Sequence, residues 1–165
     1  MIGATARRRA ILAGLLALPL AHAWAQFKEP TGPQPELPKE KLVIATRDGK
    51  THDFQIEMAT TSEQQQVGEM FRTSVPDNGG MLFVWPSVQL SGMWMKNTLV
   101  SLDMVFIDAD GTIKTIAERT VPHSLATVSS NVPVRATLEL AAGVTEKLNI
   151  RVGDKVRHKL FGTAP

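Results

Sequence analysis

The 165-residue sequence contains no cysteine and no tyrosine, and only 5% of its residues are aromatic. Without cysteine the chain can form neither a disulfide nor a thiolate metal site, and it cannot carry a lipoprotein anchor. It also shows no nucleophile elbow, no Cys–His pair, no zinc motif and no phosphate-binding glycine loop. The sequence therefore favours a binding or structural role over an enzyme and predicts no cofactor.

No apolar run in the sequence is long enough to span a bilayer. The run AILAGLLALPLA follows three arginines, and small residues at Ala21, Ala23 and Ala25 offer cleavage sites for a signal peptidase. We predict that residues 1–25 are a cleavable signal peptide, cut after Ala25 or after Ala23. The mature protein is then expected in the periplasm or outside the cell with no stable membrane anchor, exported by the Sec or the twin-arginine route.

An excess of positive charge is missing from the predicted mature chain. The whole sequence has 18 basic and 16 acidic residues, and its first 25 residues contain three arginines and no acid. The mature chain thus has 15 basic residues against 16 acidic ones, which argues against a nucleic-acid partner. Its oligomeric state is left open.

Proline, lysine and glutamate dominate residues 26–41, which predicts an extended linker. Residues 42–161 then alternate short apolar runs with Asp-Gly and Gly-Asp turns, and predict a single β-rich domain. A capping pattern at Thr60 and Glu63 predicts a helix over 62–70, and strands are expected over 93–98 and 102–107. The expected fold is mainly β (α+β), a jelly-roll-like sandwich or partly closed barrel with one or two short helices.

Four ionisable side chains emerge from apolar segments: Arg72, Lys96, Asp103 and Glu139. Burying any one of them unpaired would cost several kcal/mol, so we expect them to face one another, water or a ligand. One interpretation is an internal ion-pair network that fixes strand register. The other is a polar cleft that binds a sugar, carboxylate or phosphate, built by these four residues with Asn97 and with Trp85 or Trp94 as an aromatic wall; of the two we favour Trp94.

Two further interpretations are open. Asp103 and Glu139 could serve as an acid/base pair on an envelope polysaccharide, which requires two carboxylates about 5 to 10 Å apart. Alternatively, Met93 and Met95 could offer two thioethers to Cu(I), although methionine commonly fills cores.

The order of GGMLFVW, MWMKNTLVSLDMVFIDADG, VRATLEL and IRVGDKV resembles the prokaryotic family of domain of unknown function 192, over residues 42–156. The resemblance implies a jelly-roll-like, mainly β fold and no particular reaction. The chain departs from the family pattern at four positions. Glu69 stands where leucine is usual, Gln66 where arginine is common, Met93 where an aromatic is expected, and Ser101 where proline is expected.

Overall fold

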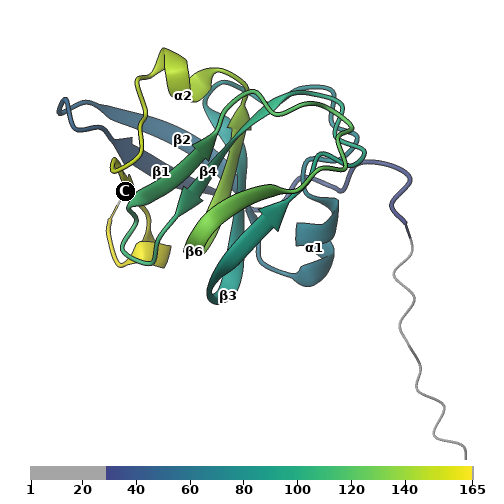
Figure 1. Ribbon diagram of the computed structural model, residues 1–165, viewed down its shortest axis with the longest axis horizontal. Helices are drawn as coiled ribbons and strands as arrows, with labels where there is room; N and C mark the ends of the chain where they lie inside the picture. Colours follow the sequence, from purple (N-terminus) through teal and green to yellow (C-terminus); the bar gives the residue numbers. More distant parts are fainter. Residues whose placement is uncertain (1–28, 165) are drawn as a thin grey trace, which may run out of the picture.

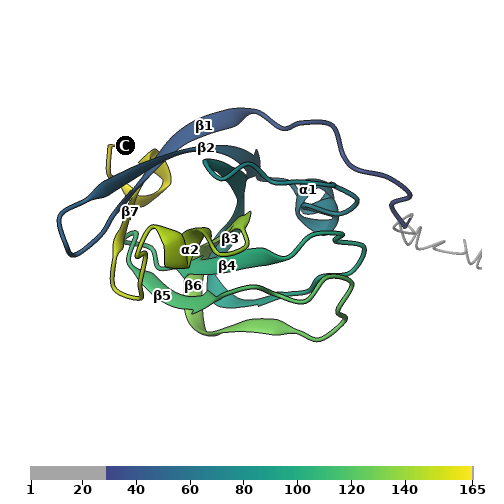
Figure 2. The ribbon, with the colours of Figure 1, turned by 90° about the horizontal axis from the view of Figure 1, so that it is seen from above.

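A single seven-stranded sheet curls round on itself to make most of the molecule (Figures 1 and 2). The computed structural model describes residues 29–164, so the predicted signal peptide lies outside the described residues. Within 29–164, no helix is both long and apolar enough to cross a membrane. In chain order the strands are β1 (Lys39–Ala45), β2 (Thr51–Ala59), β3 (Gly79–Met93), β4 (Leu102–Ile107), β5 (Ile113–Ala117), β6 (Val128–Ala141) and β7 (Lys155–Arg157).

The strands lie in the order β5-β4-β6-β3-β2-β1-β7, and all neighbours are antiparallel except β2 and β3. The parallel pair requires a crossover, which contains helix α1 (Ser62–Val67). Helix α2 (Val144–Lys147) and the 3₁₀ helix η1 (Lys159–Phe161) flank β7 in the sequence. In both views α1 lies on the opposite side of the molecule from the C-terminus (Figures 1 and 2).

The two outer strands of the sheet meet and close it into a barrel. Thr112 and Lys155 form an antiparallel bridge, and the amide of Ile113 donates to the carbonyl of Asp154 at 2.9 Å. The amide of Val156 donates to the carbonyl of Gly111 at 2.8 Å. This closure confirms the predicted β-rich fold in its partly closed barrel form with short helices.

The apolar residues form two clusters, one on each face of the sheet. The first fills the barrel with side chains from every strand, including Ile44, Phe54, Leu82, Leu138 and Val156. The second lies on the outer face of β3, β4 and β6. It contains Met81, Phe83, Met93, Met95, Leu102, Met104 and Phe106. Every residue of β4 is buried, because both of its faces are covered.

Two local predictions were wrong. Helix α1 ends at Val67, and its capping box uses Thr61 and Gln64, one residue later than the predicted pair, because β2 continues to Ala59. Residues 94–98 are not a strand: β3 ends at Met93, and Asn97 adopts a left-handed φ of 55° in a tight turn. The simple alternation expected for Trp94 to Thr98 therefore does not apply.

Barrel closure depends on a close approach at Gly111. Its φ is +81°, and a Cβ there would lie 2.3 Å from the carbonyl oxygen of Val156. Gly49 has nearly the same φ, +86°, but open space around it. We expect Gly111→Ala to lower the free energy of unfolding by about 3 kcal/mol and Gly49→Ala by about 1 kcal/mol, since only the first adds a backbone clash to the φ penalty. Urea unfolding of both variants measures the difference, and equal losses would contradict this account of closure.

Candidate functional site

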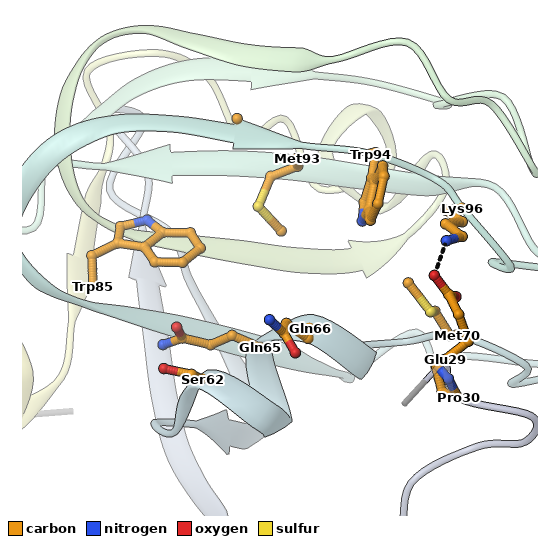
Figure 3. Close-up of a pocket in the computed structure, with 11 residues that line it drawn as sticks. Glu29, Pro30, Ser62, Gln65, Gln66, Met70, Trp85, Met93, Trp94 and Lys96 are labelled. Atoms are coloured by element: carbon orange, nitrogen blue, oxygen red, sulfur yellow. Dashed lines mark hydrogen bonds and ion pairs between the residues drawn. The ribbon is translucent and has the colours of Figure 1, made fainter. Parts of the chain in front are cut away.

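A cleft of about 430 Å³ lies between α1 and the second half of β3 (Figure 3). Figure 3 shows Trp85, Met93 and Trp94 along one wall and Ser62, Gln65 and Gln66 of α1 along the other. The remaining lining residues are Glu29, Pro30, Met70, Gly92 and Lys96. The site is thus an aromatic and thioether wall facing a row of amide and hydroxyl groups.

Trp85 is held in place by an irregularity in β3. The pairing of β3 with β6 shifts between Val84 and Gln89, where Pro86 cannot donate a ladder hydrogen bond. The indole Nε1 of Trp85 donates to Thr137 Oγ1 at 3.3 Å, and that oxygen lies 3.0 Å from Ser91 Oγ. The indole is therefore oriented before any ligand arrives.

Trp94 and Lys96 form the rim of the cleft. Trp94 is 49% exposed, unusually high for a tryptophan, and the Lys96 ammonium lies 5.2 Å from its ring centroid. Lys96 also pairs with Glu29 at 2.7 Å, as the dashed line in Figure 3 shows. The rim cation is thus already balanced by a carboxylate of the N-terminal segment.

A recess of about 20 Å³ continues from the cleft toward the sheet. It shares Gln65, Gln66, Met70, Met93 and Trp94 with the cleft, and adds Val67, Gly68, Phe83, Thr98, Glu69 and Glu139. Two carboxyl groups therefore meet a space that is about the size needed for one water molecule.

Glu139 is a buried acid with no cation beside it. It projects from β6 onto the outer face of the sheet and is only 4% exposed. Burial, reinforced by the neighbouring Glu69 charge, raises the pKa of Glu139 well above its usual range. Within residues 29–164, no side chain donates a hydrogen bond that lowers it. Burial without a neighbouring cation therefore disfavours the ionised form of this carboxyl.

Glu69 links the recess to Arg72. The Arg72 guanidinium grips Glu57 in a bidentate pair, with Nη1 to Oε1 at 2.5 Å and Nη2 to Oε2 at 2.8 Å. Its Nε lies 3.1 Å from Glu69 Oε2, in a geometry that makes no hydrogen bond. Burial raises the pKa of Glu69 to about 7, although the Arg72 charge opposes this shift and Glu57 adds to it.

Asp103 belongs to a different environment. It is completely buried, and its carboxylate accepts hydrogen bonds from the amides of Arg119, Gly143 and Thr145 at 2.9 to 3.0 Å and from Thr145 Oγ1 at 2.7 Å. It pairs across the sheet with Leu140, whose side chain lies in the barrel core. Asp103 therefore anchors the start of α2 and faces away from the cleft.

The structure separates the predicted site residues. Trp94 and Lys96 line the cleft, and Glu139 lines the recess beneath it. Arg72 lies beyond Glu69 in a second depression, and Asn97 shapes the turn through its left-handed backbone. The expectation of one shared hollow was wrong for these two residues and for Asp103.

Asp103 and Glu139 lie on opposite faces of the sheet, because Leu140, the cross-strand partner of Asp103, and Glu139 are consecutive residues of β6. They cannot act together on one glycosidic bond. This removes the acid/base pair that the sequence suggested.

Sequence reasoning missed Trp85 as a definite wall, the glutamines of α1, and Glu69. The signal for Glu69 was present, since this acid directly precedes the apolar pair Met70-Phe71. Pairing it with Glu139 requires knowledge that the turn after α1 and strand β6 line the same recess.

The two methionines of the copper hypothesis lie in different surroundings. Met93 lines the cleft together with Met70. Met95 is buried, and its sulfur accepts a hydrogen bond from Thr120 Oγ1 at 3.2 Å. Within residues 29–164, no group of three or more His, Asp or Glu side chains could hold a metal ion.

The fold and site define a small closed β-barrel domain with an aromatic cleft on its outer face. The chain belongs to the DUF192 family, described as an uncharacterised ACR, whose model matches residues 43–158. No curated protein matches the chain.

Two of the similar solved structures show how widely the fold is shared. One, from Sinorhizobium meliloti 1021, is provisionally assigned as a transcription regulator. It is 40% identical with a TM-score of 0.75, over 77% of this chain and 98% of that one. The other, a protein of unknown function from Novosphingobium aromaticivorans DSM 12444, is 32% identical with a TM-score of 0.72, over 81% and 96%.

The role of Asp103 as an anchor for α2 can be tested by Asp103→Asn. The amide would present an N–H₂ group to backbone donors, so we expect a loss of about 3 kcal/mol in the free energy of unfolding. Asp53→Asn, at an exposed position that pairs with Lys41, is the control and should change stability by less than about 0.5 kcal/mol. Chemical denaturation of both variants decides the point, and a neutral Asp103→Asn would contradict the anchoring role.

The raised pKa of Glu69 predicts a pH-dependent stability. Because the folded carboxyl holds its proton up to about pH 7, its contribution is fully present below the usual pKa of 4.5 and is lost as pH rises through 7. Glu69→Gln should therefore become more stable relative to the parent between these pH values, by about 3 kcal/mol at pH 8. Unfolding curves at several pH values measure this difference, and a pH-independent one would show that Glu69 titrates normally.

Proposed function

We propose that the mature protein is an exported binding module that holds a small amphiphilic ligand in the cleft between Trp85 and Trp94. The single observation that carries this proposal is the exposed, cleft-lining indole of Trp94 on the same wall as a pre-oriented Trp85. An exposed tryptophan contributes little to the core, whereas a pair of aromatic walls can stack on the apolar face of a ligand.

The size and chemistry of the cleft support this role. Its volume of about 430 Å³ falls within the range of small-molecule sites, which is about 300 to 1,000 Å³. Gln66 and Ser62 supply both donors and acceptors on the wall opposite the indoles, and Gln65 supplies its amide oxygen, because its amide nitrogen donates to the carbonyls of Ala59 and Val84. These groups suit a ligand with one apolar face and a few polar atoms.

The export part of the proposal rests on residues 1–25, whose arginines, apolar run and small residues have the form of a signal peptide. Mass spectrometry of the protein recovered from the cell envelope tests it: the mature chain should begin at Gln26 or Trp24. A chain that retains Met1 in the cytoplasm would refute export.

The mature chain provides its own reporter of binding. Of the three tryptophans, Trp24 lies in the predicted signal peptide, and the chain has no tyrosine. In the mature form that begins at Gln26, tryptophan fluorescence therefore arises only from Trp85 and Trp94, both in the cleft wall.

We expect at least one class of small ligand to bind in the cleft and change this fluorescence. The classes to be titrated are sugars, carboxylates, phosphates and aromatic amines. Trp94→Ala should weaken its binding by about tenfold, read from Trp85, because one stacking surface is lost. Leu90→Ala is the matched control, since Leu90 is an exposed apolar residue of β3, the strand that precedes Trp94, and does not line the cleft. Native mass spectrometry of protein from its own envelope complements the titration. Absence of any ligand in both measurements would refute the binding role.

A further inference from the structure

We propose that the recess beneath the cleft receives a primary ammonium group, with Glu69 and Glu139 as its acceptors, so that the ligand is a small primary amine. This inference rests on the proposed binding function and names the chemical class of its ligand. The apolar body of the amine would lie between the two tryptophans.

The size of the recess selects the head group. Its volume of about 20 Å³ admits one water-sized group, because a cavity needs roughly 10 to 15 Å³ to hold a water molecule. A primary ammonium is of this size and carries three hydrogen-bond donors. A trimethylammonium group is several times larger and would have to remain in the cleft above.

Among residues 29–164, Glu69 Oε2 is buried without a hydrogen-bond partner, and no side chain donates a hydrogen bond to Glu139. On the strands beside Glu139, the residues directly opposite are Met81 of β3 and Met104 of β4, neither of which ionises. In the part of the chain that the structure describes, the charged group that acts on Glu139 is Glu69, which repels it. A bound cation would replace this repulsion with two charge-assisted hydrogen bonds.

The nearby basic side chains are already occupied. Arg72 forms its bidentate pair with Glu57 and contacts Glu69 from the side away from the recess. Lys96 lies at the rim, where it pairs with Glu29. The recess thus has two acids, Glu69 and Glu139, and only part of the positive charge of Arg72 to balance them. An incoming ammonium would reduce this excess of negative charge.

Other occupants fit less well. A hard metal ion requires more oxygen ligands than the two carboxyls supply, and Met70 and Met93 are thioethers. A single water molecule would fill the space but would leave the charge imbalance unchanged. An ammonium satisfies both size and charge.

The test compares three probes that share one aromatic body: phenethylamine, 2-phenylethanol and the N,N,N-trimethyl derivative of phenethylamine. Tryptophan fluorescence and calorimetry on the mature protein measure each affinity. We expect phenethylamine to bind about tenfold or more tightly than the other two, since only it places a charged, water-sized head in the recess. Equal affinities for amine and alcohol would overturn the inference while leaving an aromatic binding cleft intact.

Glu139→Gln is the decisive variant, because it keeps the shape of the side chain and removes its charge. It should weaken phenethylamine about tenfold and leave 2-phenylethanol unchanged. Glu69→Gln supplies a second variant with the same expected direction, should the first fold poorly. Asp53→Asn is the matched control: it removes an exposed carboxylate that pairs with Lys41 and lines neither the cleft nor the recess, and it should change the amine affinity by less than about threefold.

The pH dependence provides an independent measurement. The titratable groups around the recess are Glu139 and Glu69, with Arg72 and Glu57 behind Glu69. The amine needs ionised carboxylates, so its affinity should rise between about pH 5 and pH 8 and should rise less in Glu139→Gln. An affinity that is flat with pH in both proteins would contradict the ammonium assignment, and binding of 2-phenylethanol with the same pH profile would do so as well.

Discussion

Burial of both faces of β4 and of the adjoining parts of β3 and β6, residues 79–83 and 136–140, is the constraint from which the other features follow. The inner face of these strands fills the barrel, and the outer face supports the second apolar cluster. An ionisable side chain in these parts is therefore buried whichever way it points. Asp103 points inward, where the backbone amides at the start of α2 satisfy it. Glu139 points outward, where the residues directly opposite it on both neighbouring strands are methionines. The same strand chemistry thus yields a fully hydrogen-bonded anchor on one face and, on the other, an acid whose charged neighbour is a second acid.

The electrostatics of the outer face depend on how one guanidinium is shared. Arg72 donates from both of its Nη groups to Glu57. Desolvation raises the pKa of Glu57, but the hydrogen bonds from Arg72 and from the amide of Leu37 outweigh it, so the pKa of Glu57 is lowered overall. Only Nε remains for Glu69, which explains why that carboxyl retains a raised pKa despite an adjacent cation. Glu139 receives nothing from Arg72. Compensation by the Arg72 charge thus decreases from Glu57 to Glu69 to Glu139. An external cation would therefore be stabilised most strongly in the recess.

The sequence was sufficient for the class of fold, because turn residues and apolar runs are local signals. The Asp48-Gly49 hairpin and the strand Leu102–Ile107 appear as predicted. The site was only partly accessible. The sequence identified Trp94, Lys96 and Glu139 as polar or aromatic residues within apolar segments. Trp94 and Lys96 do lie together at the cleft. Asp103 lies apart from Arg72 and Glu69 because of contacts between residues far apart in the sequence. Examples are the contacts of Thr145 with Asp103 and of Glu57 with Arg72. The turn at Asn97 also escaped, because its left-handed backbone interrupts the alternation on which face assignments rely.

The departures from the family pattern bear on specificity. Of the four positions noted, Gln66, Glu69 and Met93 all line the recess, and only Ser101 does not. A family member with arginine and leucine at the first two positions would have one more cation and one fewer acid at this point. Its recess would then complement an anionic group, whereas this chain presents two buried carboxyls. The barrel can remain the same in both cases, because these three side chains lie on its outer face and not among the residues that fill the interior. We therefore expect the sign of the ligand charge to vary among DUF192 proteins with the residues at these positions, on one shared fold.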